Sequence, residues 1–341
     1  MSENSPISEN DATNNFLISF RDEPEPRLHP GKPGTRIGAT TYIVTNPSAT
    51  TYNLKSDMVP MDTWLNRVSA SKKVVVFVHG FADDADKVLA RHNSIKQNLP
   101  PDEEFTLVSF DWPAGNYPDH PKDGYWTDKE NATAISWELL PFLQRLQLKG
   151  LSYTNMHLLA HSMGAFLTET AFQAKNSIKV NHVFMAAADV DREHYISGTD
   201  FFTTFLSHCT DLTVYWGMQD QALQESAEMN VYTPLGLTGY RDWDLPPKKQ
   251  SVQCTDYYYQ YVEAGKPDDM LESVWSHVWY LIFLPAHPPP LANDCFADII
   301  EILRGQPTTP TRTNLLRSTG AWPTASEPLT ASEPPTPATV D

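Results

Sequence analysis

The chain has 341 residues, 40% of them hydrophobic, a mean hydropathy of -0.41 and a formal net charge of -17. A surface this acidic repels phosphate backbones and anionic lipids, so we expect no nucleic-acid partner. No apolar run is long enough to predict a membrane span, and the composition favours a globular protein with room for one large core.

Residues 1–35 are polar and contain several prolines, which predicts an N-terminal extension that is extended or disordered. The first residues, MSENSPISENDATNNF, lack the basic and apolar regions of a secretory signal. The cysteines Cys209, Cys254 and Cys295 are too few for a disulfide scaffold in so long a chain. These features together predict a cytoplasmic protein.

Short apolar runs alternate with helical patterns through residues 36–305, which predicts one α/β domain with a parallel sheet and helices on both faces. Weaker patterns indicate edge strands at 40–45 and near Tyr52 and a short helix at 61–68. Residues 128–148 have the apolar spacing of a crossover helix. The runs predicted as buried strands are KVVVFV (73–78), FTLVSF (105–110), MHLLA (156–160), VNHVFM (180–185) and LTVYW (212–216).

A possible nucleophile lies where the third of these strands ends. Residues 155–167, NMHLLAHSMGAFL, run from a strand through Ala160-His-Ser162-Met-Gly into a helical segment. Small residues around a serine at a strand-to-helix turn are typical of a nucleophile elbow, although alanine replaces the first glycine of the usual pattern. The alternative is an ordinary turn whose serine caps the following helix.

A second signal follows the first buried strand, where KVVVFVHGF ends in His79-Gly80-Phe81. Acyl transfer develops negative charge on a carbonyl oxygen, which preset backbone N–H groups stabilise. The expected donors of this oxyanion hole are the N–H groups of Phe81 and of Met163, the residue after the serine. The alternative is a plain loop, which the serine turn further along the chain makes less plausible.

The His-Gly-Phe turn, the run FDWP at 110–113 and the Ala-His-Ser-Met-Gly turn together resemble the α/β-hydrolase superfamily of serine esterases and lipases. Within it they resemble a bacterial branch of hydrolases of unknown function. The resemblance covers roughly residues 40–303 and implies an α/β-hydrolase fold, with a mostly parallel central sheet and loop insertions that form a partial cap. It also implies a catalytic triad in the chain order Ser, acid, His.

For the acid, the resemblance implies a position after the strand that lies two beyond the serine, where Asp220 is found. Asp189 and Asp191 are competing candidates, because they follow the strand before it. Asp256, further along the chain, is a weaker candidate. The acid would orient the histidine and stabilise its charged form.

For the base, the resemblance implies a histidine after the last strand, which is predicted at 251–258. His277 and His287 both satisfy this condition, and His277 is preferred because SVWSHVWYL resembles the entry into the last helix. His161, directly beside the serine, is expected to pack in the turn because adjacent residues on a turn point apart.

Aromatic residues are frequent in two segments that follow strand ends, 116–127 and 231–247, which predicts a partly capped apolar acyl pocket. Trp112, His161 and Trp275 are candidate lining residues. No zinc motif, P-loop or dinucleotide fingerprint is present, so neither a metal nor a cofactor is expected.

The sequence therefore predicts a serine hydrolase that cleaves small-molecule carboxylic esters, with Ser162, Asp220 and His277 as its triad. A thioesterase, amidase or acyltransferase would use the same triad, and a non-catalytic binding protein could keep the same scaffold. Residues 306–341 are rich in proline, threonine and serine and predict a tail outside the domain. The sequence makes no prediction of the oligomeric state.

Overall fold

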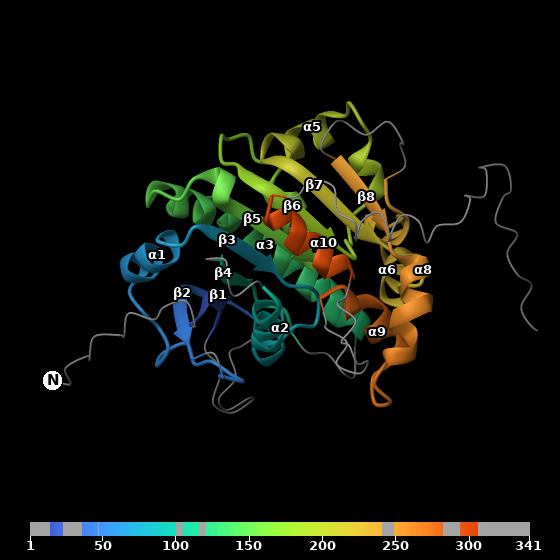
Figure 1. Cartoon of the computed structure of the whole chain (residues 1–341), viewed down its shortest axis with the longest axis horizontal. Helices are drawn as coiled ribbons and strands as arrows, with labels where there is room; N and C mark the ends of the chain where they lie inside the picture. The colour runs from blue at the N-terminus through green and yellow to red at the C-terminus, as the bar shows by residue number, and fades with distance from the viewer. Residues whose placement is uncertain are drawn as a thin grey trace, which may run out of the picture.

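A computed structural model describes residues 14–22, 36–46, 48–99, 105–115, 121–240, 249–281 and 294–305. Its strands are β1 (Asn15–Arg21), β2 (Ile37–Thr45), β3 (Lys73–Val78), β4 (Phe105–Asp111), β5 (Met156–His161), β6 (Val180–Ala186), β7 (Cys209–Trp216) and β8 (Lys249–Gln253). In the described part of the chain they form one sheet of eight strands in the order β2-β1-β4-β3-β5-β6-β7-β8 (Figure 1). The pair β1–β2 is antiparallel and the other pairs are parallel.

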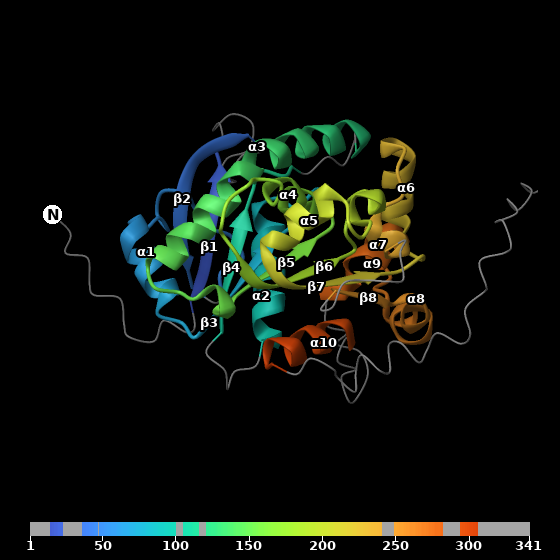
Figure 2. The same cartoon turned by 90° about the horizontal axis from the view of Figure 1, so that it is seen from above.

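Helices cover both faces of this sheet, as the alternation of patterns predicts. The α-helices are α1 (Met61–Ser69), α2 (Ala85–Asn98), α3 (Pro121–Leu148), α4 (Met163–Ala171), α5 (Asp200–Ser207), α6 (Gln221–Asn230), α7 (Leu235–Thr238), α8 (Thr255–Tyr257), α9 (Glu272–Val278) and α10 (Asp294–Leu303). Shorter turns of 3-10 or π helix are η2 (Tyr153–Asn155), η3 (Arg192–Tyr195), η4 (Tyr258–Val262), η5 (Glu263–Gly265) and η6 (Trp279–Leu281). Figure 2 shows α1, α3, α4 and α5 on one face and α2 and α10 on the other.

Burial on both faces explains why the central strands have continuous apolar sequences. In β3, Val74 and Val76 belong to the apolar core that includes Leu139 of α3. Val75 and Phe77 of the same strand belong to a separate core with residues of α2 and α10. Successive residues of a strand point to opposite faces, so a strand that is covered on both sides has no polar alternation.

Residues 15–21, predicted to belong to a polar extension outside the domain at 36–305, are instead part of its sheet. This segment forms β1, whose seven residues are all buried, and it pairs with β2 on one side and β4 on the other. The polar residues Ser19 and Arg21 make this strand hard to recognise from the sequence. Both are buried because they bond to the buried carboxylate of Asp111. Residues 1–13, 23–35 and 306–341 lie outside the described part of the chain.

Several elements differ from those predicted, most clearly near Tyr52, at the last strand and at the start of α3. Residues 51–53 are not a strand, and Tyr52 is instead a buried side chain that donates its hydroxyl to Asp111. The last strand ends at Gln253, earlier than predicted. α3 begins at Pro121 rather than at 128, as proline favours the first position of a helix.

The two segments predicted to form a cap, 116–127 and 231–247, lie partly within the described residues. Residues 121–127 are helical, and 231–240 include α7. Residues 116–120 and 241–248 lie outside the described ranges. Among the residues the structure places, no helix combines the length and apolar character that crossing a membrane requires.

Candidate active site

Ser162 lies at the sharp turn between β5 and α4, as the elbow pattern predicts. Its backbone has φ 55° and ψ -124°, a conformation that is strained for a residue with a side chain. Backbone bonds hold it there: its N–H donates to the carbonyl of Ala186 at 3.1 Å, and its own carbonyl accepts from the N–H of Asp189 at 3.2 Å. The turn thereby presents the serine side chain at the carboxyl end of the sheet.

Two glycines allow the backbone to pass close to this turn. A Cβ added at Gly164, in the first turn of α4, would lie 2.2 Å from the carbonyl oxygen of Val78 at the end of β3. A Cβ added at Gly80 would lie 2.9 Å from the Cβ of Ser162. The segment after β3 therefore packs directly against the serine.

Asp220 follows β7 and caps the N-terminus of α6, where its Oδ1 accepts from the N–H of Leu223 at 3.0 Å. The Nδ1 atom of His277 lies 2.8 Å from Oδ2 and 3.0 Å from Oδ1 of this carboxylate. An ionised carboxylate only accepts hydrogen bonds, so this contact assigns the ring hydrogen to Nδ1 and leaves Nε2 as an acceptor. Burial raises the pKa of Asp220, while the nearby His277 opposes that rise.

His277 comes after β8 and lies in the last turn of α9, a helix that precedes α10, and not at the entry into the last described helix. Burial lowers the pKa of its imidazole, but the Asp220 carboxylate raises it, and the net pKa is above the usual 6.5. His161 donates from Nε2 to the carbonyl of His277 at 3.0 Å, and the two rings lie 4.8 Å apart. Burial, and next the charge on His277, depress the pKa of His161 well below its usual range.

The competing acids do not make the contact with His277 that Asp220 makes. Asp189 accepts from the hydroxyls of Ser226 and Tyr125 and has no hydrogen bond with His277. Asp191 caps η3 by accepting from the N–H of Glu193. Asp256 is part of α8, and His287, the competing base, lies outside the described residues.

A pocket of about 150 Å³ opens beside the serine. Most of its wall is apolar, and the lining residues come from the segments after β3 and β6, from α3 and α6, and from the elbow and α9. The lining includes Phe81, Tyr125, Ser162, Leu223, Met229 and His277.

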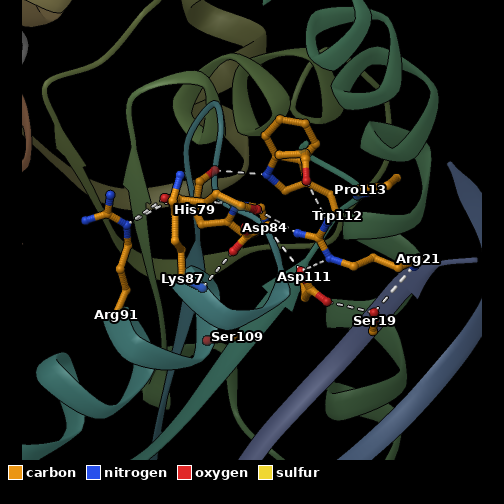
Figure 3. A network of polar contacts seen from close by, with 12 residues as sticks. Ser19, Arg21, His79, Asp84, Lys87, Arg91, Ser109, Asp111, Trp112 and Pro113 are labelled. Atoms are coloured by element: carbon orange, nitrogen blue, oxygen red, sulfur yellow. Dashed lines mark hydrogen bonds and ion pairs between the residues drawn. The ribbon is translucent and has the colours of Figure 1, made fainter. Parts of the chain in front are cut away.

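The three residues predicted to line the pocket are buried near it but do not form its wall. Trp112 stacks on His79 at 5.0 Å between ring centroids and donates to the carbonyl of that residue (Figure 3). Trp275 donates to the carbonyl of Val262. Tyr125, from the aromatic segment 116–127, does line the pocket. Leu223 lines it as well, and sequence reasoning missed this residue because the packing of α6 was not predicted.

Both residues expected to donate to the oxyanion belong to segments that adjoin Ser162. Phe81 lines the pocket and follows Gly80, whose backbone contacts Ser162. Met163 is the first residue of α4, and N–H groups in the first turn of a helix have no acceptor within that helix. The positive end of the helix dipole also favours negative charge at this place.

No group of three metal-binding side chains that could hold an ion is found within the described ranges. The polar side chains that line the pocket include serines, a histidine, a tyrosine, a lysine and carboxylates. A serine hydroxyl that lines the same pocket as a histidine fixed by a carboxylate is an arrangement suited to nucleophilic catalysis.

Comparison with known protein families identifies an alpha/beta hydrolase family. The family described as "Alpha/beta hydrolase of unknown function (DUF900)" matches residues 59–237, slightly more than half of the chain. No curated protein matches the sequence.

Three similar solved structures are esterases. An esterase/lipase from an uncultured bacterium is 11% identical, with 87% of this chain and 86% of that chain covered and a TM-score of 0.38. Esterase B from Lactobacillus rhamnosis is 12% identical, with 89% and 87% covered and a TM-score of 0.36. Esterase PE8 is 15% identical, with 55% and 85% covered and a TM-score of 0.33. At these identities and scores, none of the three indicates the activity of this chain.

Proposed function

The chain belongs to a family of alpha/beta hydrolases of unknown function, and from that premise we propose that it is a serine hydrolase that cleaves small-molecule carboxylic esters. The observation that carries the proposal is the contact of His277 with Asp220 at 2.8 Å, at a pocket that both His277 and Ser162 line. Ser162 is the nucleophile, His277 the base and Asp220 the group that orients the base.

The reaction proceeds through an acyl-enzyme. Ser162 Oγ attacks the ester carbonyl carbon and transfers its proton to Nε2 of His277. The N–H groups of Phe81 and Met163 donate to the oxyanion of the tetrahedral intermediate. The intermediate collapses, and the departing alcohol takes the proton from His277. Water, activated by the same histidine, then attacks the acyl-enzyme and releases the carboxylic acid and free Ser162.

The size of the pocket favours short acyl groups. Its volume of about 150 Å³ is well below the roughly 300–1,000 Å³ of pockets that hold drug-sized ligands. Phe81, Leu223 and Met229 supply apolar surface for an acyl chain, whereas Tyr125 and Asp189 make one side polar. Acetyl to butyryl esters are therefore the substrates we expect to react fastest.

Covalent labelling tests the proposal directly. A fluorophosphonate probe is expected to modify the protein at Ser162, as located by mass spectrometry of the labelled peptide, because the phosphonate mimics the tetrahedral intermediate. A series of p-nitrophenyl esters is expected to show a higher kcat/KM for acetyl to butyryl than for octanoyl groups. Labelling at a different residue, or folded protein that neither labels nor turns over any ester, would overturn the assignment.

The pH dependence of kcat/KM follows from the raised pKa of His277. The base accepts a proton only when neutral, so activity is lost as the pH falls through that pKa, by about tenfold per pH unit on the acid side. We expect the midpoint of this loss to lie above pH 6.5, as measured by pH-stat with a short-chain ester between pH 5 and 9. A midpoint near pH 4 would identify a carboxylate as the base and contradict the role of His277.

A further inference from the structure

Arg21 is a fully buried cation on β1, and its guanidinium bonds to the segments that follow β3 and β4. Its Nε donates to Oδ1 of Asp111 at 2.7 Å. Its Nη1 donates to the carbonyl of Ala114 at 2.6 Å, and its Nη2 donates to the carbonyl of Asp83 at 2.8 Å. Figure 3 shows this side chain extending from β1 toward Asp111 and the Trp112 loop.

Asp111, the carboxylate that neutralises Arg21, is ionised and accepts several hydrogen bonds. Burial raises the pKa of Asp111, but Arg21 and the hydrogen bonds around it lower it to about 2. Oδ2 of Asp111 accepts from the hydroxyls of Ser19 and Tyr52. His79, at the start of the segment that leads to Phe81, has its Nε2 3.4 Å from Oδ1.

The segment from His79 to Asp83, called here the oxyanion turn, is strained and tied at several points. Ala82 has a φ of 57°, a left-handed conformation that is unfavourable for a residue other than glycine and persists only where its surroundings enforce it. Asp128 of α3 accepts from the N–H of Ala82 at 3.2 Å, and Trp112 donates to the carbonyl of His79 at 2.9 Å. Arg21 holds the far end, at the carbonyl of Asp83.

We propose that Arg21 is a positioning residue, which holds the oxyanion turn against Ser162 and thereby places the N–H of Phe81. The inference rests on the proposed function and goes beyond it, because it gives a role in the reaction to a residue outside the proposed triad. That residue is on β1, which lies outside the family match at 59–237. Gly80 packs directly against Ser162, so a small relaxation of the turn moves the donor relative to the reacting carbonyl. A misplacement of about 1 Å can slow a reaction by about 100-fold.

The experiment compares Arg21→Lys with Ser19→Ala in the full chain. Lysine keeps a positive charge beside Asp111 but lacks the planar fork that reaches both carbonyls. Ser19→Ala removes a bond to the same carboxylate without touching either loop. We expect Arg21→Lys to lower kcat for the best short-chain ester by about 10- to 100-fold with KM changed less than about threefold, and Ser19→Ala to lower kcat by less than about twofold.

A second pair of variants separates positioning from stability. Arg21→Met leaves Asp111 charged and buried without its partner, and it is expected to unfold at a lower urea concentration than the wild type. Adding Asp111→Asn removes that charge and keeps an oxygen for Ser19 and Tyr52. The double variant is expected to recover urea resistance but not kcat, since the bonds to Asp83 and Ala114 are still missing. Recovery of kcat together with stability would make the role of Arg21 merely structural.

Hydrogen exchange of the peptide that spans the oxyanion turn provides a readout that needs no substrate. Faster exchange is expected at 80–83 in Arg21→Lys than in Ser19→Ala. If the wild type hydrolyses no ester but exchange rises, the proposed function fails while the attachment of the turn to Arg21 stands. If the wild type is active and folded Arg21→Lys keeps its kcat, or exchange does not change, the positioning role is overturned.

Discussion

Replacing Ser162 with alanine is expected to lower kcat for the preferred p-nitrophenyl ester by at least about 10⁴-fold, because the proposed reaction needs its hydroxyl to form the acyl-enzyme. The residual rate would come from binding and the oxyanion donors alone. Alanine and serine are similarly strained at a φ of 55°, so the free energy of unfolding should stay within about 0.5 kcal/mol of the wild type. Steady-state kinetics and urea denaturation measure the two quantities.

Ser136→Ala is the matched control for this variant. Ser136 is also buried, but it lies within α3 and its hydroxyl donates to the carbonyl of Thr133 at 2.7 Å, away from the pocket lining. Its kcat should stay within about twofold of the wild type. If Ser162→Ala kept more than a tenth of the wild-type kcat while remaining folded, the nucleophile would have to be sought elsewhere.

Asp220→Asn is expected to lower kcat by about 10³- to 10⁴-fold while the protein stays folded. The asparagine amide can donate to Nδ1 of His277, which favours the tautomer with its hydrogen on Nε2 and prevents this atom from taking the proton of Ser162. Because Asp220 raises the pKa of His277, the acid limb of the residual activity should also move to lower pH.

Asp189→Asn distinguishes the two candidate acids. Asp189 lines the pocket and accepts from Tyr125 and Ser226, so its replacement should disturb the pocket, but by less than about tenfold in kcat. Short-chain ester kinetics of the two variants, measured side by side, decide the assignment. A larger loss in Asp189→Asn than in Asp220→Asn would move the acid to the end of β6.

The sequence predicts the parallel part of the sheet and the order of the chemistry-bearing residues because these depend on local patterns. Strands buried on both faces need continuous apolar runs, and β3, β5 and β6 have them. The turn at Ser162 needs small neighbours, and Gly164 passes so close to β3 that a larger residue would clash with the backbone. Such requirements are visible in a few consecutive residues.

The features that the sequence does not predict depend on contacts between distant segments. Arg21 and Asp111 are separated by 90 residues, and each would be taken as a solvent-exposed charge when considered alone. The pocket wall combines Tyr125 with Leu223 and Met229 of α6, which no local pattern connects. His277 likewise becomes part of the site only through the packing of α9 against α6.

The left-handed backbone at Ser162 sets stability and reactivity in opposition at a single residue. Glycine adopts such a conformation without the penalty that a Cβ incurs, so it would suit this position better on energetic grounds alone. A library of variants selected only for resistance to heat would therefore tend to accumulate glycine at position 162 and lose the hydroxyl. Efforts to make this protein more durable should hold that position fixed and seek their gains elsewhere in the fold.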